Sequence, residues 1–134
     1  MTSAPAVLVV EDDADVRSLV VFALERLGLR VRAEDDGATG LAAALAGEFD
    51  LIVLDWMMPG LDGLEVCRRL RATPRTARIP VPMLTAVARP DDADGALTAG
   101  ADAYISKPFT REELGDTIRA LLARSLDART PRGG

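Results

Sequence analysis

The chain has 134 residues, of which 49% are hydrophobic and 28% charged, and these values suit one globular domain with its own core. It contains no histidine and one cysteine, which excludes histidine-dependent triads, internal disulfides and zinc clusters. The net charge of −5 gives no electrostatic reason to expect nucleic acid binding by this domain.

Neither the hydropathy of the chain nor its N-terminal residues indicate a membrane or secreted protein. No apolar run approaches the roughly 18 residues that cross a bilayer. The first residues carry no basic segment of the kind that opens a signal peptide. We therefore expect a cytoplasmic protein that makes no membrane contact.

Short apolar runs alternate with longer amphipathic stretches along the chain. Runs of 4–8 residues without polar interruption are typical of strands buried on both faces, and apolar residues spaced by three and four are typical of helices. The predicted strands are 7–10, 29–33, 50–54, 79–84 and 103–106. The predicted helices are 13–27, 38–46, 62–72, 91–99 and 110–124. This order predicts an α/β fold, (βα)₅, with a parallel sheet covered on both faces.

Local signals mark several helix ends. Gly28 directly follows the first helix, at the position where a glycine commonly ends a helix. Asp62 with Glu65, and Thr110 with Glu113, have the spacing of capping boxes at the start of the third and last helices.

The fourth strand and helix fit their pattern less well. Pro82 lies inside the predicted strand, where it cannot donate a ladder hydrogen bond, and Gly95 lies inside a helix poor in large apolar residues. For the chain as a whole we expect a tail at 1–5, one domain at 6–124 and a flexible tail or linker at 125–134.

Acidic residues follow the two most apolar strands. Glu11 and Asp12 come directly after the first strand, and Asp55 comes after the third. Ligands of an open parallel sheet bind beyond the carboxyl ends of its strands. If the two strands are neighbours, three acids meet in one pocket, where their mutual repulsion favours a bound cation. Oxygen ligands of this kind suit Mg²⁺.

A carboxylate beside a metal ion and a fixed cation can perform phosphoryl transfer. Lys107 is the only lysine among 16 cationic residues, and its place after the last strand makes it a candidate for that cation. A compact ammonium fits beside a carboxylate and a phosphate better than a guanidinium does. The alternative for the acids is that they only begin helices, and the alternative for Lys107 is an ordinary surface position.

Four motifs, VLVVEDD, LIVLDWMMPGLDG, MLTA and KPF, occur in this order between about Ala6 and Arg124. Together they resemble the receiver domain of two-component response regulators. The resemblance implies a flavodoxin-like three-layer sandwich with the parallel strand order 2-1-3-4-5.

The resemblance also implies a set of metal ligands. Asp55 matches the aspartate that accepts the phosphoryl group. Asp12 matches a direct Mg²⁺ ligand, Glu11 an acid that acts through water, and Met57 the residue whose backbone carbonyl completes the protein's share of the shell. Mn²⁺ is expected to substitute for Mg²⁺.

A second group matches the residues that contact the phosphoryl group. These are the hydroxyl of Thr85, the backbone of Ala86 and the ammonium of Lys107, with Tyr104 as the aromatic that turns inward when Thr85 moves. Lys107-Pro108 matches a cis peptide of the family. Without the resemblance, Thr85 would be interpreted as an ordinary strand residue, and Tyr104 would be interpreted as a core residue.

The implied partner is a sensor histidine kinase or a histidine phosphotransfer protein. Phosphorylation would shift an equilibrium between two conformations that is read out on the fourth helix, fifth strand and fifth helix. The same face implies a possible homodimer. Ala103, however, stands where the DNA-binding branch of the family often has an acid, which puts that dimer in doubt.

Two other classes of function are compatible with such a fold. One is a phosphate-ester hydrolase with an aspartyl nucleophile, but its second acid would fall at Met57. The other is an interaction module that is never phosphorylated. Met57 and Val87 lie two residues after Asp55 and Thr85, and we expect them to flank the phosphoryl group. Because neither side chain can orient an attacking water, we expect a phosphorylated form to hydrolyse slowly.

Overall fold

The structure is a computed structural model that describes residues 4–86 and 99–129. The elements are β1 (Ala6–Val10), α1 (Ala14–Arg26), β2 (Arg30–Glu34), α2 (Gly37–Ala46), β3 (Leu51–Asp55), α3 (Gly63–Ala72), β4 (Pro82–Thr85), β5 (Ala103–Ser106) and α5 (Arg111–Arg129). The predicted helix at 91–99 lies, apart from its last residue, outside the described residues.

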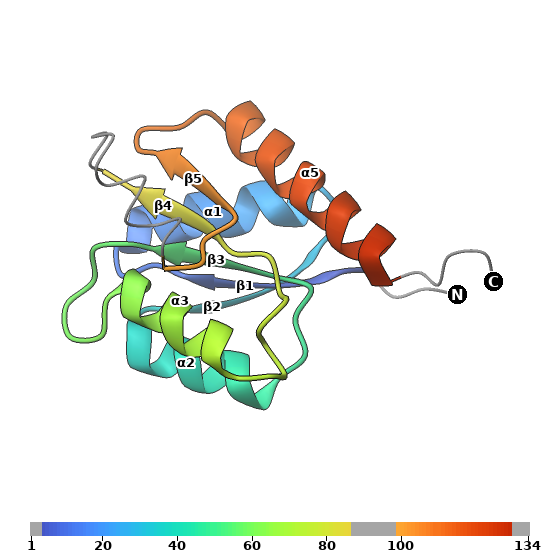
Figure 1. The fold of residues 1–134 in the computed structure, drawn as a ribbon. Coiled ribbons are helices and arrows are strands. Elements are labelled where there is room, and N and C mark those ends of the chain that lie inside the picture. Colours follow the sequence, from blue (N-terminus) through green and yellow to red (C-terminus); the bar gives the residue numbers. More distant parts are fainter. Residues whose placement is uncertain (1–3, 87–98, 130–134) are drawn as a thin grey trace.

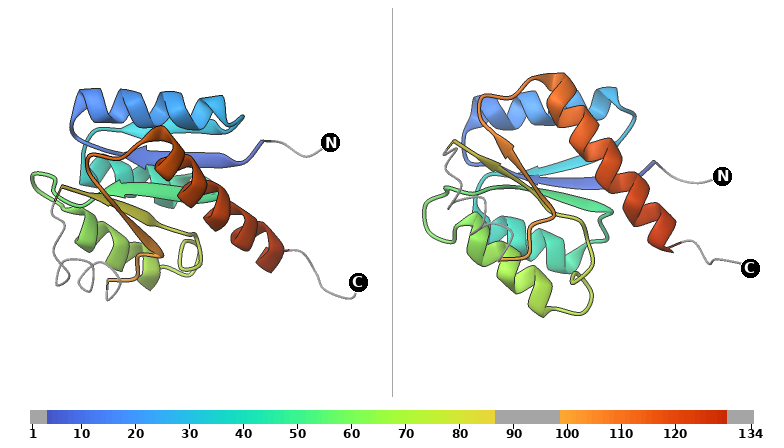
Figure 2. Two further views of the ribbon diagram at one scale, coloured as in Figure 1. Left: turned by 90° about the horizontal axis from the view of Figure 1, so that it is seen from above. Right: turned by 45° about the horizontal axis from the view of Figure 1, so that its top comes forward.

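All five strands are parallel, in the order β2-β1-β3-β4-β5, as the resemblance implied. Helices α1 and α5 cover one face of the sheet, and α2 and α3 cover the other (Figures 1 and 2). The predicted flavodoxin-like three-layer sandwich is therefore confirmed.

Strands β1 and β3 form the centre of the core because all of their residues are buried. Alternate side chains of each strand point to opposite faces of the sheet. On β1, Val7 and Val9 pack toward α1 and α5, whereas Leu8 and Val10 pack toward α2 and α3. Two apolar clusters, one on each face, hold the helices to the sheet.

The predicted helix ends are confirmed where they rest on local contacts. Asp62 accepts the Glu65 amide at 2.9 Å, and Thr110 accepts the Glu113 amide at 3.0 Å while donating to its carboxylate at 3.2 Å. Gly28, just past α1, has φ +85°, which a glycine adopts without steric cost.

Two predicted boundaries differ from the structure by three or more residues. Strand β4 begins at Pro82 instead of residue 79, which places the proline at the first strand position, where a missing donor is tolerated. The Val81 amide donates to the Asp102 carboxylate at 2.7 Å instead of to a neighbouring strand. Helix α5 continues to Arg129, past the expected end near Arg124, because no helix breaker occurs before Pro131.

Among the described residues, each helix is too short or too polar to cross a bilayer.

Candidate functional site

The acidic residues converge because β1 and β3 are neighbours in register. Val10 lies opposite Leu54, so Glu11 and Asp55 emerge side by side at the carboxyl edge of the sheet. Carboxylate oxygens of Glu11, Asp12 and Asp55 lie within 4.8 Å of one another. Glu11 is fully buried, Asp55 is 3% exposed, and Asp12 is exposed at the rim. The predicted convergence of the three acids is confirmed.

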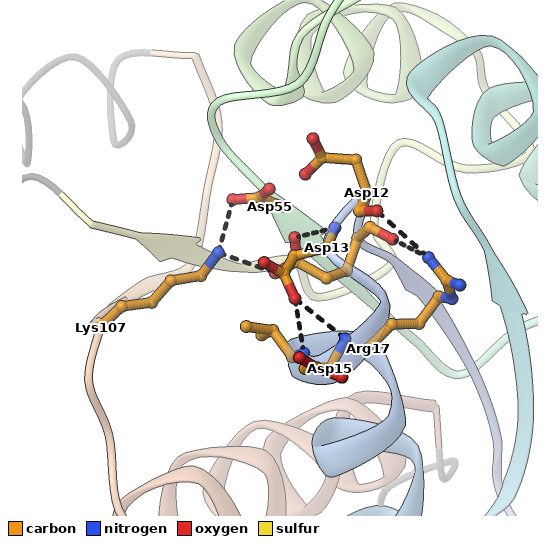
Figure 3. Close-up of polar contacts among 8 residues, drawn as sticks. Asp12, Asp13, Asp15, Arg17, Asp55 and Lys107 are labelled. Atoms are coloured by element: carbon orange, nitrogen blue, oxygen red, sulfur yellow. Dashed lines mark hydrogen bonds and ion pairs between the residues drawn. The ribbon is translucent and has the colours of Figure 1, made fainter.

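Lys107 reaches this cluster from the turn after β5. Its Nζ lies 2.8 Å from Glu11 Oε1 and 3.2 Å from Asp55 Oδ1 (Figure 3). Its backbone amide donates to the Thr85 carbonyl at 2.6 Å, which joins the turn to the end of β4. The Lys107-Pro108 peptide is cis, as the resemblance implied. Lys107 is therefore a site residue and not an ordinary surface lysine.

The acids of the site repel one another more than a single ammonium can balance. Burial, hydrogen bonding to Glu11 and Asp12, and repulsion from Glu11 together raise the pKa of Asp55 to about 8, although the Lys107 ammonium acts in the opposite direction. Hydrogen bonding to Asp55 lowers the pKa of Asp12. Burial opposes the charge of Lys107, but its contacts with Glu11 and Asp55 outweigh that effect and raise the pKa of the ammonium. One ammonium faces three acids, so the cluster can accept more positive charge.

The backbone after β3 is held close to Asp55 by a glycine. A Cβ built on Gly63 would collide with the Asp55 carbonyl, and the Gly63 amide donates to the Trp56 carbonyl at 2.9 Å. This contact closes the loop between β3 and α3. Within the loop the Trp56 indole is half-buried, and the Met57 side chain is 63% exposed. The apolar position two residues after Asp55 therefore faces solvent at the rim.

The other predicted residues lie at the ends of the adjoining strands. Thr85 is fully buried at the end of β4, the strand next to β3, and Ala86 follows it at the surface. Tyr104 is half-buried on β5, opposite Met83 of β4. Val87, which we predicted to flank the phosphoryl group, lies outside the described residues.

The turn between β1 and α1 is ordered by its own polar contacts. Asp13 accepts the amides of Asp15 and Val16 at 2.9 and 3.0 Å and is therefore the N-cap of α1. Its own amide donates to Glu11 Oε2 at 3.1 Å. Arg17 donates to the backbone carbonyl of Glu11 at 2.9 Å and lies 3.4 Å from that of Asp12.

Sequence reasoning missed two arginines that bind backbone carbonyls, Arg17 at the carboxyl edge of the sheet and Arg71 at the opposite edge. Arg17 could not be found from sequence because an arginine that binds backbone leaves no pattern in the chain. Arg71 lies in the last turn of α3, donates to the carbonyls of Ala77, Ile79 and Gly100, and pairs with Asp102 at 2.6 Å. Arg71 thereby fastens the segment before β4 to the start of β5.

The donor set fits a hard divalent cation. Three carboxylates with no histidine or thiolate among them offer only oxygen ligands, the preference of Mg²⁺ and Mn²⁺. Among the described residues, Glu11 Oε1 is buried without a hydrogen bond of acceptable geometry, its contact being the ion pair with Lys107. The exposure of Asp12 leaves an open side through which hydrated metal can enter.

Comparisons with known proteins agree with this geometry. Residues 7–119 match the response regulator receiver domain family. The chain is 45% identical over 121 residues to the DNA-binding dual master transcriptional regulator RpaA of Synechocystis, covering 90% of this chain and 50% of that protein. It is 39% identical over 119 residues to the phosphate regulon regulator PhoB of Pseudomonas aeruginosa, covering 89% and 52%.

The chain is also similar to a receiver domain of known structure. The receiver domain of sensor histidine kinase PA1611 from Pseudomonas aeruginosa, solved with a magnesium ion in its active site cleft, superimposes with a TM-score of 0.84 at 32% identity, covering 90% of this chain and 98% of that one. The chain spans about half the length of the two regulators. Fold, acid cluster and similarity together establish that this chain belongs to the response regulator receiver domain family.

Proposed function

We propose that this domain accepts a phosphoryl group on Asp55 from a phosphohistidine and changes conformation in response. The observation that carries the proposal is the position of the Asp55 carboxylate, which is almost completely buried between the Lys107 ammonium and two further acids. Such a carboxylate is held in place for in-line attack and has a cation beside the oxygens that gain charge.

In the proposed reaction an oxygen of Asp55 bonds to phosphorus while the P–N bond to the donor histidine breaks. The imidazole nitrogen keeps the electron pair, and an acyl phosphate remains on Asp55. Lys107 would neutralise the phosphoryl oxygens, and the Thr85 hydroxyl and the Ala86 amide would bind them afterwards. Tyr104 would follow the movement of Thr85, which would carry the change toward β5 and α5.

The proposed metal is Mg²⁺, for which Mn²⁺ should substitute. Asp12, Asp55 and the Met57 carbonyl would hold it directly, and Glu11 through water. When bound, the ion neutralises charge on the phosphoryl oxygens. Support comes from the oxygen-only donor set and from the magnesium ion in the similar PA1611 receiver domain.

The proposed donor is a sensor histidine kinase or a histidine phosphotransfer protein, because the chain has no histidine that could carry the phosphoryl group itself. The domain would catalyse only its own phosphorylation and slow dephosphorylation. Similarity to transcriptional regulators supports a cytoplasmic location and an output domain or partner that reads the switch. We also propose a possible homodimer through the predicted fourth helix, β5 and α5. If it forms, the molecular mass of the domain in solution should increase with protein concentration after treatment with beryllofluoride, which mimics the phosphoryl group.

Phosphorylation by a small phosphodonor tests the proposal directly. The wild-type domain incubated with acetyl phosphate and Mg²⁺ should gain the mass of one phosphoryl group, and chelation of the metal should prevent the gain. Asp55→Asn should remove labelling. Asp15→Asn, which changes an exposed acid in the first turn of α1 outside the three-acid cluster, is the matched control and should keep it. Labelling that persists in Asp55→Asn refutes the assignment, and turnover of a phosphomonoester would favour a hydrolase instead.

A further inference from the structure

Arg17 occupies a position that is unfavourable for a cation on two counts. It belongs to the first turn of α1, where the helix dipole favours acids, and it follows closely after the proposed ligands of a divalent cation. A compensating interaction should therefore exist, and the backbone of the β1–α1 turn provides it. Arg17 Nη1 lies between two carbonyls, 2.9 Å from that of Glu11 and 3.4 Å from that of Asp12.

The two cations near the turn act on different atoms. Lys107 contacts the carboxylates of Glu11 and Asp55, whereas Arg17 Nη1 donates to backbone oxygens. Figure 3 shows them on opposite sides of the turn, with Lys107 beside Asp55 and Arg17 on the side away from it. Arg17 therefore does not face the phosphoryl acceptor but holds the peptide that carries the acids.

We propose that Arg17 is a positioning residue of the Mg²⁺ site, which it serves by fixing the backbone of Glu11 and Asp12. This inference rests on the proposed function, because it assumes that these acids bind the metal. Without the guanidinium, this turn keeps the cap that Asp13 forms and the bonds of the Asp13 amide to Glu11 and of the Glu11 amide to Glu34, but the carbonyls of Glu11 and Asp12 lose their side-chain donor while the three carboxylates still repel one another. The turn would then relax away from Asp55, and the ligands would be less well ordered for the metal.

The direction in which Mg²⁺ affinity changes when Arg17 is removed distinguishes this positioning role from a purely electrostatic effect of its charge. If Arg17 acted only through its charge, removing it would reduce repulsion of an incoming cation and strengthen Mg²⁺ binding. If it positions the ligands, removing it weakens binding. We expect Arg17→Ala to raise the Mg²⁺ dissociation constant roughly 3- to 10-fold. This is at or below the smallest loss of affinity that is usual when a residue bound to a metal ligand is removed, because Arg17 contacts the backbone and not a ligand atom.

Arg17→Lys tests geometry at constant charge. Its ammonium can bond one carbonyl but lacks the planar group that lies between two, so its dissociation constant should fall between those of the wild type and Arg17→Ala. Two controls complete the set. Arg26→Ala removes the same charge from the last turn of the same helix, and Arg71→Ala removes a guanidinium that binds backbone carbonyls at the opposite edge of the sheet. Both should bind Mg²⁺ like the wild type.

Binding can be measured without any phosphoryl transfer. Trp56 is the only tryptophan and adjoins Asp55, so its fluorescence should report Mg²⁺ titration, with calorimetry as a second readout. Circular dichroism establishes that each variant is folded at the temperature used. A higher dissociation constant in Arg17→Ala, an intermediate one in Arg17→Lys and unchanged controls support the proposal. Equal or tighter binding by Arg17→Ala overturns it, whereas absence of Mg²⁺ binding by the wild type overturns the proposed function itself.

Discussion

Replacing Asp55 by asparagine removes one of three carboxylates that lie within 4.8 Å of one another, and it should stabilise the metal-free domain. The pKa of Asp55 is about 8 in the folded protein against an ordinary value of 3.8. Between these two values the folded state binds more protons than the unfolded state, so stability falls as pH rises through this window. Asparagine has no such pH dependence.

The size of the effect follows from the two pKa values. One pKa unit is equivalent to about 1.4 kcal/mol, so at pH 7 the upper bound on the lost stability is about 4 kcal/mol. Asparagine needs hydrogen-bond partners of its own, and Lys107 loses one of its two carboxylate partners, which offsets part of the gain. We therefore expect Asp55→Asn to raise the free energy of unfolding by about 1–3 kcal/mol at pH 7.

Urea unfolding in the presence of a chelator, followed by circular dichroism at pH 5 and pH 8, measures this difference. The advantage of Asp55→Asn should be larger at pH 8. Asp116→Asn is the control, because Asp116 is 75% exposed and its loss should change stability little at either pH. Added Mg²⁺ should stabilise the wild type more than Asp55→Asn. A variant that is no more stable than the wild type at pH 8, or equally favoured at both pH values, would refute the reasoning.

Three further outcomes follow from the site. Because protons compete with the metal for Asp55, whose pKa is raised to about 8, Mg²⁺ affinity measured by calorimetry should increase from pH 6 to pH 8, and a flat profile would contradict this. Gly63→Ala should lower the free energy of unfolding by about 1–3 kcal/mol, because its Cβ would meet the Asp55 carbonyl; unchanged urea stability would count against that contact. Since the apolar Met57 is exposed at the rim, the phosphorylated domain should hydrolyse slowly in a time course of intact mass, and decay within seconds would show otherwise.

Most of the fold was predictable because the signals are local. A buried central strand appears in the sequence as a continuous apolar run. The start of a capped helix appears as a residue whose side-chain oxygen can accept the free backbone amide two or three residues later. Asp62 and Thr110 could therefore be assigned from spacing alone. The start of β4 could not, because the backbone of Val81 is satisfied by the side chain of Asp102, which is remote in sequence. Nothing near Val81 in the chain indicates that partner.

For the site, the residue types and their places after strands were enough to indicate a cation and a carboxylate nucleophile. The sequence by itself determined which groups were available: three acids, one lysine and no histidine. Their environment was decided by the tertiary structure. Pairing of β1 with β3 places Glu11 beside Asp55, and the burial of Asp55 together with this neighbouring acid raises the pKa of Asp55. The contact of Arg17 with two backbone carbonyls likewise appears only once the turn is folded, because any long cationic side chain can in principle reach a carbonyl and only the fold selects which one does.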